Sequence, residues 1–185
     1  MKVLKFGGTS VANAQNILLV EKIVRKESSE NRVVVVVSAL SGVTDGLISA
    51  AESASAKNEN YSETIKTLEE KHLEFVKNLL PITEQSTWLS FVKKNFNDIE
   101  DICNGIYVLG EFTPRIKDKI TAYGEFLSSN IIAAKLKSDG LDCVWLDSRN
   151  YIKTNSNFTD AKVDFEKTNA NFQNYFKENK QQVTL

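Results

Sequence analysis

Five consecutive valines occupy residues 33–37, and this run constrains the fold more than any other part of the chain. Valine favours extended backbone, and a run without polar alternation is typical of a strand that is buried on both faces. A second short apolar segment lies at residues 3–6. Between the two, residues 11–26 carry apolar side chains at helical spacing, and Thr9 or Ser10 is placed to cap that helix. Strand, helix and strand in this order predict a βαβ unit with a right-handed crossover.

The rest of the chain alternates between helical and strand patterns. This alternation predicts an α/β fold, a three-layer α/β/α sandwich around a mostly parallel central sheet. No internal repeat or Gly/Ser-rich linker marks a boundary, so we expect one domain over residues 1–185, with a helical excursion at about residues 61–104. Helices are predicted at residues 45–56, 114–137 and 163–179, and two long helices, divided near Pro81, are predicted between residues 61 and 102. Strands are predicted at residues 142–146 and 182–185.

Gly124 lies inside the helix that is predicted at residues 114–137. A glycine in a helix interior costs up to about 1 kcal/mol relative to alanine. Its presence therefore indicates close packing or a local bend of the helix at this position.

The charge balance excludes some classes of partner. The chain has 23 Lys and Arg residues against 24 Asp and Glu residues and no long basic run that could follow a phosphate backbone, so nucleic-acid binding is not expected. No apolar stretch approaches the roughly 20 residues of a membrane span, and the glycines after residue 6 interrupt the start too early for a signal peptide. We therefore expect a cytoplasmic protein with no membrane partner.

Cys103 and Cys143 have no Cys or His at metal-ligand spacing and are expected to be reduced thiols.

His72 is the only histidine, and it lies in a polar helical run at residues 69–74. Its polar neighbours favour a solvated position on the helix surface. A histidine-dependent nucleophilic triad or a multi-histidine metal site would have to be built from this single side chain. We therefore expect chemistry that uses lysine, carboxylates, hydroxyls and backbone groups, and we predict no metal-ligating residue.

The sharpest local feature is the sequence KFGGTS at residues 5–10, where the first strand turns into the first helix. Gly7 and Gly8 allow the backbone to approach a ligand closely, and the following helix offers free N–H groups and its positive dipole end. Lys5 adds a positive charge at the edge where ligands bind in open parallel sheets. The segment matches neither the P-loop nor the dinucleotide-binding fingerprint. It predicts a phosphate site, with tight packing of the turn as the alternative.

A second turn, SALSGVTD at residues 38–45, follows the valine strand and contains three hydroxyls and a glycine before the next helix. If the two strands are neighbours, both turns face one cleft. Helix capping is the alternative interpretation of Ser41, Thr44 and Asp45.

These motifs carry a resemblance to a known family. Residues 3–12 (VLKFGGTSVA) resemble the opening signature of aspartokinases in the amino acid kinase family, and residues 37–45 resemble the family's second motif. Residues 123–129 (YGEFLSS) are similar to its Gly-Glu-x-x-Ser segment, and residues 147–149 (DSR) to its Asp-x-Arg stretch. The resemblance covers the whole chain, although residues 61–102 match only in helical character. Residues 11–14 and 105–110 resemble the aspartokinase half of bifunctional aspartokinase–homoserine dehydrogenases.

The resemblance implies transfer of the γ-phosphoryl group of MgATP to the side-chain carboxylate of L-aspartate, the first step toward lysine, threonine and methionine. ATP and Mg²⁺ are the implied cofactors. The substrate carboxylate is already ionised at neutral pH, so the reaction needs no general base and depends on positioning and charge neutralisation.

The family pattern also implies roles for single residues. Lys5 contacts the transferring phosphates, and Gly7 and Gly8 shape the phosphate loop, with Thr9 and Ser10 beside it. Ser38 lies on the active-site loop, and Thr44 and Glu125 occupy aspartate-site positions.

Two other readings of the chain stay open at this stage. One is a related kinase for another acidic metabolite, such as glutamate or N-acetylglutamate, and the other is a non-catalytic regulatory or assembly fragment.

Domains of this family are longer than 185 residues, and their later part holds the nucleotide-base pocket. We therefore expect the chain to be an N-terminal part of such a domain, cut inside its sheet. Alone, it is expected to bind anions without turnover. An exposed sheet edge would favour a homo-oligomer.

Overall fold

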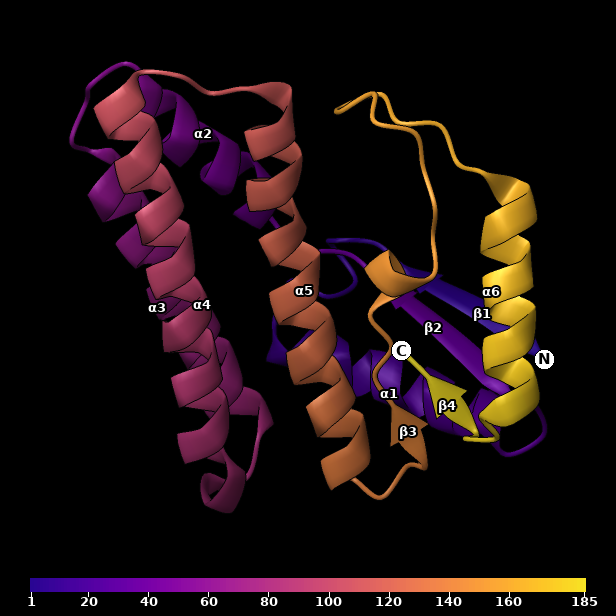
Figure 1. Cartoon of the computed structure of the whole chain (residues 1–185). Helices are drawn as coiled ribbons and strands as arrows, with labels where there is room; N and C mark the ends of the chain where they lie inside the picture. The colour runs from indigo at the N-terminus through magenta and orange to yellow at the C-terminus, as the bar shows by residue number, and fades with distance from the viewer.

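A four-stranded parallel sheet forms the centre of the computed structural model, which describes all residues from 1 to 185 (Figure 1). The strands are ordered β1-β2-β4-β3, and every neighbouring pair is parallel. Because β1 and β2 are adjacent and joined by a helix, the predicted βαβ unit is confirmed. The strands are β1 (Lys2–Phe6), β2 (Val33–Val37), β3 (Cys143–Val144) and β4 (Val183–Thr184).

Helices cover both faces of this sheet, so the predicted α/β/α arrangement is confirmed. In Figure 1, α1 lies behind the sheet and α6 in front of it, while α2, α3 and α4 form a helical group on the far side of α5. The two long helices predicted between residues 61 and 102 are present, and the second continues to Leu109. The helices are α1 (Ala14–Ser28), α2 (Val43–Ser55), α3 (Tyr61–Leu79), α4 (Ile82–Leu109), α5 (Pro114–Ser138) and α6 (Phe165–Glu178), with a 3₁₀ turn η1 (Ser148–Asn150).

The valine strand β2 is buried on one face only, so the expectation of burial on both faces was wrong. Val33 and Val35 point into the core that α1 helps to form and are buried, whereas Val36 is 46% exposed. Its register partner in β1 is Lys5, which lies on the same face of the sheet. A cavity, described below, leaves this second face of β2 open.

The first helix begins later than predicted, because a different residue caps it. The side chain of Asn13 accepts a hydrogen bond from the Asn16 N–H at 2.9 Å, so α1 starts at Ala14. The N–H of Ser10 instead donates to the Gly7 carbonyl at 2.9 Å. Thr9 and Ser10 therefore belong to the turn after β1 and do not cap the helix.

His72 is completely buried, which overturns the expectation of a solvated residue. Its Nδ1 lies 2.7 Å from the carbonyl oxygen of Leu68, its ring centroid is 5.2 Å from that of Phe96, and its Nε2 has no hydrogen-bond partner. Burial lowers the pKa of His72 to about 4. The helical spacing identifies this position where the polar neighbours do not, because the buried stripe of α3 consists of Ile65, Leu68, His72, Phe75, Val76 and Leu79.

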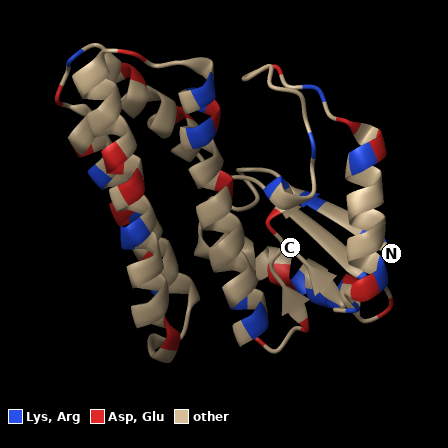
Figure 2. Ribbon diagram, viewed as in Figure 1, with Lys and Arg blue, Asp and Glu red and all other residues tan.

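Both cysteines are free, in agreement with the expectation of reduced thiols. Burial raises the pKa of Cys103 to about 11 and that of Cys143 to about 12, so both thiols are protonated at neutral pH. Figure 2 shows that Lys and Arg are interspersed with Asp and Glu along the helices. None of the helices combines the length and the apolar character that crossing a bilayer requires.

The buried histidine predicts a specific pH dependence of stability. The unfolded chain binds a proton at His72 below about pH 6.5, whereas the folded protein does so only below about pH 4. The free energy of unfolding should therefore lose roughly 3 kcal/mol from this group between pH 6.5 and pH 4. His72→Leu removes the only histidine, so denaturant unfolding of wild type and variant across this range isolates the effect. Parallel pH profiles for the two proteins would contradict the prediction.

Candidate functional site

The turn after β1 has several groups that no part of the protein uses. The Lys5 side chain is exposed and forms no hydrogen bond or ion pair. The backbone N–H groups of Gly8 and Thr9 donate to no acceptor in the chain. A lysine ammonium and free backbone N–H groups in one turn are suited to an anion such as a phosphate group.

The fold itself does not require the two glycines of this turn. Neither has a positive φ. A Cβ on Gly7 would lie 3.9 Å from Lys5 Nζ, and one on Gly8 would lie 3.5 Å from the Ala39 carbonyl oxygen, both at ordinary van der Waals distance. The alternative that these glycines serve only tight packing therefore loses its basis, and the open space favours the close approach of a ligand.

The turn after β2 lies directly beside the first turn, as expected for neighbouring strands. The Ser38 N–H donates to the Phe6 carbonyl at 3.2 Å, and a Cβ on Gly8 would lie 3.9 Å from Ser38 Oγ. Gly42 has a φ of +78° and immediately precedes α2. The two predicted motifs thus meet at one edge of the sheet.

Helix α5 brings a third segment to the same place. Glu125 Oε1 accepts a hydrogen bond from the Ala39 N–H at 3.2 Å, and Ser128 Oγ donates to the Ser38 carbonyl at 2.8 Å. Glu125 is otherwise exposed. It therefore lies at the turn after β2 and not on a remote surface of the helix, although nothing in its sequence surroundings predicts this contact.

Gly124 permits this approach of α5. A Cβ at this position would lie 2.8 Å from the Ala39 Cβ, 3.5 Å from Val43 Cγ1 and 3.8 Å from Thr44 Oγ1. The close packing predicted for Gly124 is therefore confirmed. The same contact places the Thr44 hydroxyl next to the residue that precedes Glu125.

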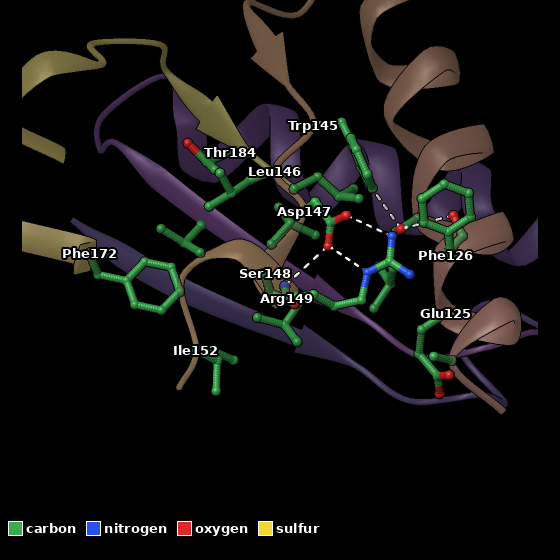
Figure 3. A pocket seen from close by; sticks show the side chains of 17 residues that line it. Glu125, Phe126, Trp145, Leu146, Asp147, Ser148, Arg149, Ile152, Phe172 and Thr184 are labelled. Atoms are coloured by element: carbon green, nitrogen blue, oxygen red, sulfur yellow. Dashed lines mark hydrogen bonds and ion pairs between the residues drawn. The ribbon is translucent and has the colours of Figure 1, made fainter. Parts of the chain in front are cut away.

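A cavity of about 500 Å³ opens along the exposed face of β2 (Figure 3). Of the predicted site residues, only Glu125 lines it, and Figure 3 shows its carboxylate pointing away from the Arg149 guanidinium. Lys5 lies on the same face of the sheet, as the register partner of Val36 in the cavity wall. The wall is formed by β2, by α5, by the chain end at Thr184 and Leu185, and by Trp145, Leu146, Asp147, Ser148, Arg149, Ile152 and Phe172.

Asp147 and Arg149 form a two-point ion pair in this cavity. Arg149 donates from Nε to Asp147 Oδ1 at 2.8 Å and from Nη2 to Oδ2 at 2.6 Å, and its guanidinium carbon lies 4.7 Å from the centroid of the Phe126 ring. The hydrogen bond from Arg149 holds the pKa of Asp147 below its usual value. From the sequence, the pair has no predicted role beyond a motif match, and the Asp-x-Arg spacing is the signal that could identify it. The two hydrogen bonds orient both side chains along this part of the cavity wall, and the opposite charges largely cancel.

These residues do not form a magnesium site by themselves. Nowhere in the chain do three His, Cys, Asp or Glu side chains come together as a metal site. The free groups of the first turn are donors, which suit phosphate oxygens and not a cation. The arrangement can hold an anion at the first turn and a second polar group near Thr44 and Glu125, and it offers neither a histidine nor a thiolate as a base or nucleophile.

Known proteins resemble the chain along its whole length. A family model described as the amino acid kinase family matches residues 1–183. The chain is 33% identical to a chloroplastic bifunctional aspartokinase/homoserine dehydrogenase 1 of Arabidopsis thaliana, over 99% of this chain and 20% of that protein. It is 32% identical to an aspartokinase of Chlamydia pneumoniae, over 92% of this chain and 35% of that protein. The chain thus spans about a fifth to a third of these relatives.

Solved structures show the same fold. The structure of E. coli aspartokinase III in complex with aspartate and ADP superimposes with a TM-score of 0.84 at 21% sequence identity, over 100% of this chain and 40% of that one. The same enzyme in complex with lysine and aspartate gives a TM-score of 0.87 at 22% identity.

The contact at Gly124 predicts opposite effects for two glycine substitutions. Gly124→Ala forces a Cβ against Ala39 and should destabilise the protein by about 1–3 kcal/mol, because overpacking displaces the turn after β2. Gly105→Ala is the matched control on α4, where a Cβ meets nothing within 4 Å, and should stabilise by about 1 kcal/mol. Denaturant unfolding measures both. Equal stabilisation by the two substitutions would show that α5 does not approach the turn this closely.

Proposed function

The chain belongs to the amino acid kinase family, and on this basis we propose that the complete protein is an aspartate kinase. It would transfer the γ-phosphoryl group of MgATP to the side-chain carboxylate of L-aspartate, giving 4-phospho-aspartate and ADP. The observation that carries the proposal is the turn at Gly7 and Gly8, where Lys5 and two backbone N–H groups have no partner in the protein. The names of the relatives support aspartate as the acceptor.

In the proposed reaction, one oxygen of the substrate carboxylate forms a bond to the γ-phosphorus. The bond from that phosphorus to the β–γ bridging oxygen breaks, and ADP leaves with the electron pair. Lys5 and the N–H groups of Gly8 and Thr9 hold phosphate oxygens and offset their charge in the transition state. Bound Mg²⁺ would supply further neutralisation of the phosphates. No side chain has to remove a proton, because a carboxylic acid with a pKa of about 4 is ionised at neutral pH.

The acceptor would lie against the second turn and α5. Thr44 and Glu125 come from separate helices, and the Thr44 hydroxyl lies 3.8 Å from the place that a Cβ on Gly124, the residue before Glu125, would occupy. A carboxylate here suits the α-ammonium group of aspartate, while Ser38 belongs to the loop between acceptor and phosphates. The Ala39 N–H holds the Glu125 carboxylate in place.

The other readings of the chain have less support. No observation favours glutamate or N-acetylglutamate as the acceptor. A non-catalytic regulatory or assembly fragment would keep the same free groups at the glycine turn, so the names of the relatives, and not this turn, favour the enzyme. The role in lysine, threonine and methionine synthesis, the cytoplasmic location, the homo-oligomer and the lack of turnover by residues 1–185 alone stay predictions.

Lys5 is the first test of the proposal. In the complete gene product, Lys5→Met should lower kcat by about 100-fold or more, because it removes the charge beside the transferring phosphate. The melting temperature should stay nearly unchanged, because the exposed Lys5 side chain forms no hydrogen bond or ion pair. Lys22→Met, at an exposed position of α1, is the matched control and should keep wild-type turnover. A coupled ADP-release assay measures kcat. Near wild-type turnover by Lys5→Met would contradict the role of Lys5 at the transferring phosphate.

The acceptor side can be tested separately. Thr44→Val and Glu125→Gln should each raise KM for aspartate on the order of 10-fold or more, because each leaves a polar group of the substrate without its partner. KM for ATP should change little. Glu70→Gln, on the exposed side of α3, controls for the loss of one negative charge. If both variants keep the wild-type KM for aspartate, these two residues do not form the acceptor site.

A further inference from the structure

Lys71 projects from α3 to the turn after β2. Its Nζ donates to the carbonyl oxygen of Ser41 at 2.5 Å. This lysine comes from the helical pair α3 and α4, whose sequence indicates nothing beyond helices. It is the one side chain of that pair with a hydrogen bond to either of the two turns of the candidate site.

The packing of α3 determines the direction in which Lys71 points. His72, the next residue, is completely buried against Phe96 and fixes the rotation of the helix about its axis. Successive helical residues are 100° apart, so Lys71 lies beside the buried stripe of α3, on the side from which its ammonium reaches Ser41. Lys71 is itself half-buried, and together with Leu40 it lines a small cavity of about 280 Å³ between α3 and the start of α1.

The turn is held from two sides. On one side, α5 holds its beginning, through Ser128 on the Ser38 carbonyl and Glu125 on the Ala39 N–H. On the other side, Lys71 holds its end at Ser41. The next residue is Gly42, whose left-handed backbone conformation redirects the chain into α2. The position of the Ser41 carbonyl therefore determines where α2 begins.

Two groups of the candidate site depend on that position. Thr44 is the second residue of α2 and moves with the start of the helix. The Cα of Ser41 also lies 4.0 Å from the place that a Cβ on Gly8 would occupy, so the same residue packs against the phosphate turn. A shift of Ser41 would change the distance between Thr44 and the phosphate turn. In the proposed reaction, this distance separates the acceptor substrate from the phosphate groups of ATP.

We propose that Lys71 is a positioning residue for the acceptor substrate. Its ammonium does not touch the substrate but fixes the Ser41 carbonyl, and so holds Thr44 at the correct distance from Gly8. The part that concerns catalysis rests on the proposed aspartate kinase function. The structural part, that Lys71 orders residues 40–44, is independent of it.

Three variants of the complete gene product test this role. Lys71→Met keeps the apolar stem and removes the donor, Lys71→Arg keeps a donor, and Lys66→Met is the matched control at an exposed position of the same helix with no partner. Lys71→Met should raise KM for aspartate on the order of 10-fold, with a much smaller change in KM for ATP, because a hydrogen bond from a charged group is lost. Lys71→Arg should recover most of this loss, and Lys66→Met should resemble wild type.

Hydrogen exchange gives a readout that does not need activity. Within residues 40–44, the Val43 amide is the one that donates a hydrogen bond, to the Leu40 carbonyl, and in Lys71→Met it should exchange on the order of 10-fold faster than in wild type and in Lys66→Met, while the amides of α5 stay unchanged. Unchanged exchange in residues 40–44 would overturn the proposal whatever the kinetics. Faster exchange with an unchanged KM for aspartate would also overturn it, because the ordered turn would then not serve the acceptor. If wild type itself lacks aspartate-dependent ADP release, the proposed function fails, and exchange alone decides whether Lys71 orders the turn.

Discussion

The parallel pairing of β1 with β2 is the constraint on which the candidate site depends. Five consecutive residue pairs, from Lys2 with Val33 to Phe6 with Val37, bring both strands to an end at the same edge of the sheet. The glycine turn and the turn that begins at Ser38 are therefore neighbours before any side chain is considered. A shift of this register by one residue would also turn Lys5 to the other face of the sheet, where α1 packs.

The third component, α5, is held to these turns by contacts between residues far apart in the sequence. Glu125 and Ala39 are 86 residues apart, and Ser128 and Ser38 are 90 apart. Closing such long loops is entropically costly, and the packing of the helices between them offsets part of that cost. The helical group α2, α3 and α4 thus has a function in the site, because its packing places α5 and Lys71 on opposite sides of one turn.

The sequence predicts local features of this structure well and tertiary ones poorly. Apolar spacing predicts the helices and the βαβ unit, and the paired glycines predict the turn after β1, while its binding of phosphate stays a prediction. The partial exposure of β2 could not be predicted, because how fully the second face is covered depends on the placement of distant segments such as Phe172. The solvated reading of His72 gave its neighbours more weight than its spacing from Leu68 and Phe75. Glu125 was identified by a motif, whereas the ion pair of Arg149 and the contact of Lys71 needed the tertiary structure.

Under the proposed function, the charge of Glu125 would give the acceptor site a means of discrimination. In the structure the carboxylate is exposed to water apart from one backbone hydrogen bond, so its charge costs little. A substrate that covers it removes that water, and a buried carboxylate without a partner is strongly unfavourable. The α-ammonium group of aspartate would restore a partner, whereas an N-acetylated amino acid would offer only a neutral amide and leave the negative charge uncompensated. In the proposed reaction, Glu125 would therefore select an acceptor with a free amino group.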